Sequence, residues 1–436
     1  MKQNKVAYAR YKLQDPAFLS RLMYLAFAVS VLAQLVVLIY FWGKPQFSDQ
    51  KGYMELARQC FSFNDWYPIP AQVYSRYIWA PGFVNFLILQ LKVFGTMNAN
   101  GVFNLLMNLA IIGEIYFIGQ RFFNASTAKL AVIFWCILYS NILLVAPSGT
   151  EIPFLFLCLT AFCLCLSQNI LLIIIAGALF ALANWIRPLA VIFLPAVILY
   201  MAMHRFKLVH YISLLLPIFL VITWIGISTK ERIGYFVHQS TTSGMNLIMT
   251  SNDKAYGGVA NFLTNDPTSI AYIADEDKYT FAQKDSIWKS RAIFWIKSNT
   301  AKAAQLYAKK LVGLYVEDSW ADRPLLGGDA LIGSYVVTNK VSKAIFFKEI
   351  GLRVAKSLFF YLLLIAFVYS LIVNRKELLS EKGLFLLILV LGTLLTSVFA
   401  VSPRYHYPFT FVLVLFAAYG FDTLLRTTKK ELSERH

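Results

Sequence analysis

The stretch from Leu19 to Trp42, LSRLMYLAFAVSVLAQLVVLIYFW, decides the class of fold, because Arg21 is its one charged residue. A transmembrane helix needs roughly 20 mostly apolar residues to cross about 30 Å of hydrocarbon. Runs of this kind recur along the chain, at about 19–42, 101–120, 128–146, 152–167, 170–186, 189–203, 210–227, 353–373, 383–400 and 407–425. The sequence therefore predicts an all-α polytopic membrane protein with about 10 transmembrane helices.

The composition of the 436 residues leads to the same class. Apolar residues make up 58% of the chain and charged residues 14%, with a mean hydropathy of +0.60. Such values exclude a soluble globular enzyme, a disordered chain and a secreted disulfide scaffold. The net charge of +17 is typical of cytoplasmic loops that face anionic lipid. We therefore expect membrane lipids, and no nucleic acid, among the partners.

An eleventh apolar run, 82–94, is too short to be assigned by length, since runs of about 10–14 residues are often interfacial. If it does not span, the basic residues of the short loops and tail fall on the same side as the basic amino terminus; these are Arg121, Lys129, Arg205, Lys207, Arg375, Lys376, Lys382, Arg426, Lys429, Lys430 and Arg435. Cytoplasmic loops carry an excess of Lys and Arg. We therefore expect an interfacial helix at 82–94, both termini in the cytoplasm, and a multi-pass protein of a bacterial inner membrane.

This topology divides the chain into three parts. Residues 1–227 form an N-terminal transmembrane module whose outer loop, 43–100, carries interfacial helices. Residues 228–352 form a large, mostly helical periplasmic loop, and residues 353–436 hold the last transmembrane helices and a cytoplasmic tail. Most of the extramembrane chemistry is therefore expected on the outer face.

The first outer loop begins with a candidate carboxylate, Asp49. The residues after it predict a short amphipathic helix on the membrane surface, because apolar side chains recur at helical spacing (Tyr53, Leu56, Ala57, Cys60, Phe61). Two interpretations of Asp49 stay open. The frequency of Asp at helix starts favours an N-cap, whereas a carboxylate beside the bilayer would meet a lipid-linked substrate. The aromatic residues from Trp66 to Trp79 likewise fit either an interfacial belt or a groove that stacks on sugar rings.

Several charged residues lie within or at the ends of apolar runs. Glu114 is mid-span and predicts a structural hydrogen bond, while Glu151 and Arg187 flank spans at the outer end. Such groups are functional hypotheses by default, and snorkelling or an interhelical pair is the alternative. Arg404, before the last run, is suited to an interfacial phosphate, and His406 is more often a buried interface histidine than a metal ligand. No HExxH, CxxC pair, Walker loop or GxSxG supports hydrolase or ATPase chemistry.

Short motifs place these residues in an ordered series. In chain order they are Asp49-Gln50 at the start of the first outer helix, Asp65-Trp66-Tyr67-Pro68, Trp79-Ala80-Pro81-Gly82 leading to Phe94-Gly95, Glu151 at the fourth run, Arg187-Pro188 before the sixth, and Arg404-Tyr405 before the last. In order and spacing the chain resembles the integral-membrane glycosyltransferases of the C superfamily, especially the branch of protein O-mannosyltransferases and lipid A aminoarabinose transferases. The resemblance covers about residues 1–230 well.

The resemblance implies a polyprenyl-phosphate-sugar-dependent hexosyl- or pentosyltransferase that works with inversion on the outer, periplasmic face. It makes Asp49 the catalytic base. Arginines are implied at the donor phosphate (Arg58, Arg76, Arg187, Arg404), and the sugar and acceptor pocket is expected to include Tyr53, Asp65, Trp66, Glu151, Tyr405 and His406. Gln50 stands where the family has a second acid, so no metal ligands are assigned, and a divalent cation stays open as the cofactor.

The expected partners are a polyprenyl-phosphate sugar donor and a lipid, glycan or protein acceptor. Two other functions remain alternatives. A flippase or transporter of lipid-linked sugars would show internal repeats and interrupted spans at matched positions. A polysaccharide polymerase or ligase would not need an interfacial helix that starts with Asp.

Overall fold

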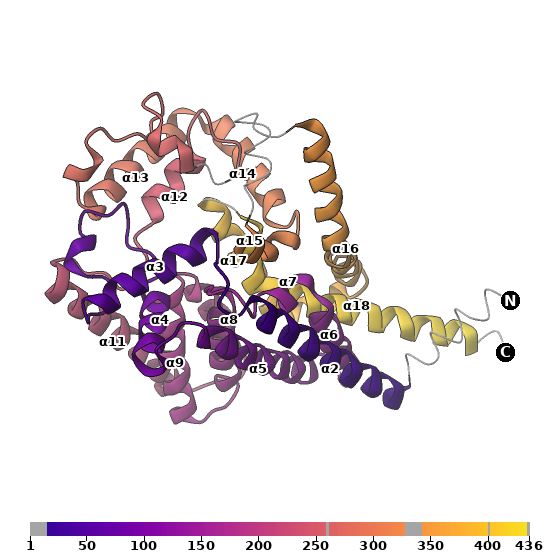
Figure 1. The fold of residues 1–436 in the computed structure, drawn as a ribbon. Coiled ribbons are helices and arrows are strands. Elements are labelled where there is room, and N and C mark those ends of the chain that lie inside the picture. The colour runs from indigo at the N-terminus through magenta and orange to yellow at the C-terminus, as the bar shows by residue number, and fades with distance from the viewer. Residues whose placement is uncertain (1–14, 259–260, 328–341, 400–401, 434–436) are drawn as a thin grey trace.

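The computed structural model describes residues 15–258, 261–327, 342–399 and 402–433, and every regular element among them is a helix (Figure 1). Five segments are long and apolar enough to cross a membrane, namely α2 (Pro16–Phe41), α5 (Ala99–Phe122), α11 (Leu208–Ile233), α16 (Lys343–Val373) and Pro403–Thr427, which holds most of α18 (Tyr407–Ser433). Shorter apolar helices are α4 (Pro81–Phe94), α6 (Ala125–Ile137), α8 (Glu151–Leu164), α9 (Ile170–Ile186), α10 (Phe193–Met203, after the 3-10 turn η2, Ala190–Ile192) and α17 (Gly383–Val398). The prediction of an all-α, multi-pass membrane protein is confirmed.

Helix α18 lies at the centre of the bundle. In its most apolar stretch 83% of the residues are buried, against 22% in each of α2, α11 and α16. It packs against α6 and α16. Because an apolar face that no protein covers must meet lipid in a membrane protein, α2, α11 and α16 are the helices that present most of their surface to the bilayer.

The predicted span 128–146 is not one helix. Leu138 has extended backbone angles, so α6 ends at Ile137 and a short helix, α7 (Tyr139–Leu143), follows. The break frees backbone groups, and side chains pair with them: Asn141 Nδ2 donates to the Trp135 carbonyl, and the Ser140 N–H donates to Asp318 Oδ2. Because these backbone groups keep hydrogen-bond partners in a dry interior, the break costs little free energy.

Two helices cross the predicted boundaries between the three parts of the chain. Helix α11 continues to Ile233, past residue 227, and α16 begins at Lys343, ten residues before the predicted span at 353. With 31 residues and about 1.5 Å of rise per residue, α16 is roughly 46 Å long, which exceeds the hydrocarbon thickness of about 30 Å. Its first turns therefore extend beyond the membrane core unless the helix tilts.

The segment between α11 and α16, which corresponds to the predicted second outer loop and is called here the second outer segment, has a hydrophobic core of its own. Its longer helices are α12 (Ser243–Thr250), α13 (Phe281–Ser298) and α14 (Thr300–Leu314), which lie together at the top of Figure 1. Buried side chains of this core are Met245, Leu247, Ile248, Met249, Leu263, Ala271, Ile273, Trp288 and Ala292. The same segment also contains the short elements η3 (Asn261–Asn265), η4 (Glu276–Lys278), η5 (Ser319–Asp322) and α15 (Arg323–Leu326). Short turns in other connections are η1 (Pro70–Gln72), η7 (Arg375–Leu379) and η8 (Pro403–His406).

Residues 43–98, which correspond to the predicted first outer loop, are called here the first outer segment. Its first helix is the predicted amphipathic helix, α3 (Ser48–Ser62). Tyr53, Ala57 and Cys60 are buried on one face, and Lys51 and Arg58 are exposed on another. The N-cap of α3 is Phe47, which makes no side-chain capping bond, and Asp49 lies in the first helical turn. The N-cap interpretation of Asp49 is therefore wrong, since its carboxylate projects from the helix instead of closing it.

Candidate active site

Four charged side chains from distant parts of the chain alternate in sign. Asp49 pairs with Arg404, and Arg404 Nε lies 3.9 Å from Glu151 Oε1. The same Glu151 oxygen lies 3.4 Å from Arg187 Nη1. Asp49 is the most exposed of the four side chains, at 31%, followed by Arg404 at 16%, whereas Arg187 and Glu151 are 9% and 2% exposed. Two carboxylates thus offset two guanidiniums at the ends of the helices.

Local sequence explains why these side chains converge. Glu151 is the first residue of α8, where a carboxylate is stabilised by the positive end of the helix dipole. Arg187 follows the last residue of α9 in an extended conformation, and Pro188 prevents the helix from continuing. Arg404 lies in the 3-10 turn η8, just before α18. Each of them therefore marks a helix end, and all three ends lie on the side predicted to face outward.

Two aromatic rings frame the charges. The ring of Tyr405 lies 5.0 Å from the guanidinium carbon of Arg187 and 5.3 Å from that of Arg404, which are cation–π distances. Tyr53 is 3% exposed, and its ring centroid lies 4.3 Å from that of Trp79. Burial, followed by the nearby Asp49 carboxylate, raises the pKa of Tyr53 well above its ordinary value. Its hydroxyl therefore stays protonated and can donate a hydrogen bond.

Two cavities meet at this charged group. The first, called here the Arg187 cavity, measures about 360 Å³ and includes Arg187, Ile186 and Tyr53 in its lining. The second, the Asp49 cavity, measures about 560 Å³ and includes Asp49, Gln50, Tyr77 and Arg323. The residues that line both are Trp79, Thr242, Asn246, Arg404 and Tyr405. Arg404 and Tyr405 therefore face two spaces, with Asp49 on one side and Arg187 on the other.

A long apolar groove lies beside the Arg187 cavity. It measures about 640 Å³, and its lining comes from α4, α5, α8, α9 and α11, including Trp224. We call it the Trp224 groove. Ile186 lines both the Trp224 groove and the Arg187 cavity. The two spaces thus meet at the outer end of α9.

The side-chain oxygens near Asp49 do not form a binding site for a divalent cation. Among the described residues there is no group of three or more His, Cys, Asp and Glu side chains that could hold one. Glu151 Oε2 and Gln50 Oε1 are buried and have no hydrogen-bond partner there. However, Arg404 contacts both carboxylates and Arg187 contacts Glu151. A donor set already neutralised by two guanidiniums does not fit a dication.

Arg58 lies outside these cavities. It is nine residues from Asp49 on α3, which is roughly 13 Å along the helix axis. It lines a separate cavity of about 630 Å³ on the other side of α3, together with Lys44 and Lys51. We call this space the Arg58 cavity. Arg58 is therefore removed from the set of arginines expected at the donor phosphate.

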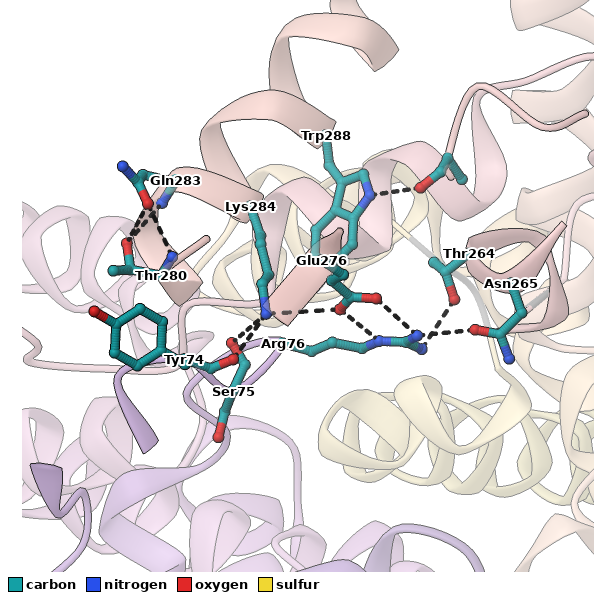
Figure 2. Close-up of polar contacts among 11 residues, drawn as sticks. Tyr74, Ser75, Arg76, Thr264, Asn265, Glu276, Thr280, Gln283, Lys284 and Trp288 are labelled. Atoms are coloured by element: carbon teal, nitrogen blue, oxygen red, sulfur yellow. Dashed lines mark hydrogen bonds and ion pairs between the residues drawn. The ribbon is translucent and has the colours of Figure 1, made fainter. Parts of the chain in front are cut away.

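Arg76 is likewise committed elsewhere, as Figure 2 shows. Its Nε donates to Glu276 Oε1 at 2.7 Å, and Nη2 donates to Glu276 Oε2 at 2.9 Å. Thr264 and Asn265 accept further hydrogen bonds from the same guanidinium. The buried Lys284 donates to the carbonyls of Tyr74 and Ser75 at 2.8 and 3.3 Å. Arg76 thus fastens the first outer segment to the second, and it does not line either cavity at Asp49.

Three other predicted pocket residues also lie apart from Asp49. Asp65 pairs with Arg232 at 2.8 Å, and Trp66 lines the Trp224 groove, where Lys92 lies 4.6 Å from its ring. His406 is fully buried on the far side of its 3-10 turn. Its Nδ1 lies 2.7 Å from the Leu314 carbonyl, and its ring stacks on Phe360. His406 is a packing residue, and it lines neither cavity.

Sequence reasoning missed some of the lining. The sequence marks Trp79 only as one of several aromatic residues that fit either an interfacial belt or a sugar-stacking groove, and as part of the motif before a helix. Thr242, Asn246 and Arg323 come from the second outer segment, where no motif marks them. Gln50, beside the candidate base, was noted only as a departure from the family pattern. Its burial to 1% exposure beneath Asp49 follows from the turn of α3.

Comparisons with known proteins give a likeness of structure only. No protein-family model and no curated protein matches the chain. The oligosaccharyltransferase of Archaeoglobus fulgidus in its apo form is 11% identical, with a TM-score of 0.49, over 94% of this chain and 52% of that one. The archaeal enzyme AglB in complex with an inhibitory peptide and a dolichol-phosphate is 12% identical, with a TM-score of 0.46, over 95% of this chain and 52% of that one.

A bacterial protein matches over more of its own length. ArnT from Cupriavidus metallidurans bound to undecaprenyl phosphate is 13% identical, with a TM-score of 0.41, over 92% of this chain and 77% of that one. The chain therefore spans about half the length of the archaeal enzymes. With identities of 11–13% and TM-scores from 0.41 to 0.49, these likenesses carry no conclusion about the activity of this chain.

Proposed function

We propose that this protein is a membrane glycosyltransferase that moves a sugar from a polyprenyl-phosphate carrier to an acceptor hydroxyl on the outer face of a bacterial inner membrane. The observation that carries the proposal is the alternating group of Asp49, Arg404, Glu151 and Arg187 in the wall between two cavities. Such a wall can hold a base on one side and cations for a leaving group on the other.

The donor is assigned to the Arg187 cavity. Its phosphate would meet the guanidiniums of Arg187 and Arg404, which line that space. The polyprenyl chain would run past Ile186 into the Trp224 groove, whose apolar lining lies among the membrane helices. Tyr405, held between the two arginines, and Trp79 would contact the sugar. This arrangement keeps the lipid in the bilayer and the reacting carbon at the outer surface.

The acceptor is assigned to the Asp49 cavity. Its hydroxyl would give its proton to the Asp49 carboxylate as the oxygen forms a bond to the anomeric carbon of the sugar. The bond from that carbon to the carrier phosphate oxygen breaks, and the electron pair leaves with the phosphate. Arg187 and Arg404 stabilise the charge that grows there; removing one such donor typically costs about 2.7–4 kcal/mol of transition-state stabilisation.

The same arrangement supports inversion of the anomeric configuration. A retaining mechanism needs a second carboxylate that attacks the sugar. Glu151 shares Arg404 with Asp49, but it is 2% exposed and engaged by both arginines. We therefore propose a single displacement, with Glu151 holding the arginines in place and Asp49 as the base.

The test is transfer of a radiolabelled sugar from its polyprenyl-phosphate carrier in membranes that contain the protein. Asp49→Asn keeps the shape of the side chain and removes its basicity, so transfer should fall by at least the 10²-fold typical of general base catalysis. The matched control is Asp277→Asn, an exposed carboxylate of the second outer segment. Near-normal transfer by Asp49→Asn at equal protein levels would remove Asp49 from the mechanism. Movement of the carrier across the bilayer without transfer would favour a flippase instead.

A further inference from the structure

The Arg58 cavity is a second polar space, on the side of α3 that faces away from Asp49. It is bounded by the turn between α2 and α3, by α3 itself, and by the turn between α4 and α5. Its volume of about 630 Å³ falls within the roughly 300–1,000 Å³ of small-molecule sites. Three basic side chains line it, Lys44, Lys51 and Arg58, with Glu55 as its one acidic residue. Nothing in the proposed transfer reaction uses this space.

The positive charge of the cavity is largely uncompensated. Lys51 pairs with Glu55 at 3.7 Å, but these side chains are 65% and 59% exposed, so solvent screens the pair. Neither Lys44 nor Arg58 has an ion pair with any residue that the structure describes. Asn98, at the start of α5, also lines the cavity and makes no side-chain capping bond. The positive end of the α5 dipole lies at this edge of the cavity and adds to a field that attracts an anion.

Exposed apolar side chains come directly before two lining residues of the cavity, Gly43 and Gly95, in the sequence. Trp42, which follows α2, is 49% exposed, and Val93 and Phe94 at the end of α4 are 61% and 55% exposed. Exposed aromatic residues at helix ends are typical of the membrane–water interface. An anion held among Lys44, Lys51 and Arg58 would therefore lie at the depth of lipid headgroups, with its apolar part along α2 and α4.

We propose that the Arg58 cavity binds the phosphate headgroup of an anionic phospholipid of the outer leaflet. Lys44, Lys51 and Arg58 hold the phosphate, and the exposed apolar side chains near the cavity favour a lipid over a soluble phosphate. Because α3 forms the wall of this cavity and also carries Asp49 in its first turn, a bound lipid would stabilise the helix that presents the candidate base. The binding does not depend on the proposed transfer reaction.

The test uses the full-length protein in nanodiscs of phosphatidylcholine alone, or of phosphatidylcholine and phosphatidylglycerol in equal parts. Melting temperature is measured in both, and retained phosphatidylglycerol is counted by native mass spectrometry after transfer to detergent. A ligand that binds only the folded state raises its stability, so phosphatidylglycerol should raise the melting temperature of the unaltered protein. Each basic residue near an anionic surface contributes a factor of about five, so Lys44→Gln with Arg58→Gln should weaken lipid retention about 25-fold.

Three controls make the result decisive. Lys230→Gln with Lys297→Gln removes the same charge from exposed positions outside the cavity and should leave retention unchanged. Lys44→Arg with Arg58→Lys keeps the charge and should retain the lipid as the unaltered protein does. This variant separates the loss of charge from damage to folding. Inorganic phosphate should not reproduce the rise in melting temperature. Equal retention by the glutamine variant and the unaltered protein, or an equal rise with inorganic phosphate alone, would overturn the proposal.

Discussion

Arg404 is the residue on which the candidate site depends most, because its guanidinium contacts both Asp49 and Glu151. A guanidinium offers several N–H donors in a fixed planar fork, whereas an ammonium acts as a single point charge. Arg404→Lys should therefore keep the net charge but fail to contact both carboxylates. We expect transfer to fall about 10²–10³-fold, by analogy with the loss of one preorganised donor.

The control for this change is Arg375→Lys, an exposed residue of η7 far along the chain from the cavities. Rates should be compared at equal amounts of folded protein in the membrane. If Arg404→Lys transferred sugar at the rate of the control, the guanidinium would not be the group that stabilises the leaving phosphate.

The same residue scale shows what the sequence could reveal. Glu151, Arg187 and Arg404 were recognisable because each interrupts or ends an apolar run, and a charge at that position is costly unless it has a purpose. Arg58 was not separable from them, since only the turn of α3 decides which side it faces. His406 follows Arg404 and Tyr405 directly, yet the 3-10 turn directs it into the core against Phe360. Whether a candidate residue faces the site thus depends on the local turn of the backbone, which the sequence motifs do not indicate.

At the scale of elements, the fastening of the two outer segments determines where Tyr77 and Trp79 lie. Besides the Arg76 contacts, backbone hydrogen bonds join Val73 to Phe281 and Ile78 to Thr241. Lys284 is 1% exposed and donates to two carbonyls just before Arg76 (Figure 2). These bonds link residues about two hundred positions apart. The sequence could not indicate this pairing, because one lysine in a loop rich in lysines carries no signal.

Replacing that buried lysine should therefore loosen the cavity wall. Lys284→Met would leave the carbonyls of Tyr74 and Ser75 without their donor, and each buried unpaired group costs about 1–3 kcal/mol. We expect a lower melting temperature and a raised KM with a smaller change in kcat, since Trp79 lines both cavities but is not assigned to proton transfer. Lys289→Met, on the exposed side of the same helix, is the control and should leave both quantities unchanged. An unaltered melting temperature for Lys284→Met would show that the contact does not fasten the segments.

A second buried lysine links α14 to α17. Lys310 is 4% exposed and its Nζ donates to the Val398 carbonyl at 3.2 Å. Burial lowers the pKa of Lys310 from its ordinary value of 10.5 to about 8. The unfolded chain therefore binds more protons than the folded one between about pH 8 and 10.5, and the contribution of this residue to stability rises with pH in that window.

Lys310→Met should make that dependence visible. The variant lacks the cost of burying a charge, but it also lacks the donor to the Val398 carbonyl, so the pH dependence of the difference in melting temperature isolates the charge. Relative to the variant, the unaltered protein should be least stable below pH 8 and should gain stability as the pH approaches 10.5, where its lysine is neutral in the folded state. Melting temperatures of the two proteins in the same detergent, across this range of pH, measure the difference. A difference that stayed constant would contradict the lowered pKa.

At the scale of the whole molecule, the number and order of the apolar runs were sufficient to predict an all-helical membrane protein. The break at Leu138 and the early start of α16 were not predicted. The break at Leu138 depends on a partner from elsewhere in the fold, since Asp318 accepts a hydrogen bond from the freed N–H of Ser140. Helix α16 starts at a local cap instead, where the Ser342 side chain accepts a hydrogen bond from the Ile345 N–H. Apolar length indicates that a helix exists, whereas its ends are set by polar groups that apolar length does not register.

The most direct test of the central claim is a structure of the full-length protein with a polyprenyl phosphate bound. The proposal predicts that the phosphate lies within hydrogen-bonding distance of Arg187 and Arg404, in the Arg187 cavity. The first isoprene units should pass Ile186 and enter the Trp224 groove. A polyprenyl phosphate whose own phosphate lies away from Arg187 and Arg404, or whose chain leaves the protein without touching the groove, would contradict the assignment of the donor site and of the function built on it.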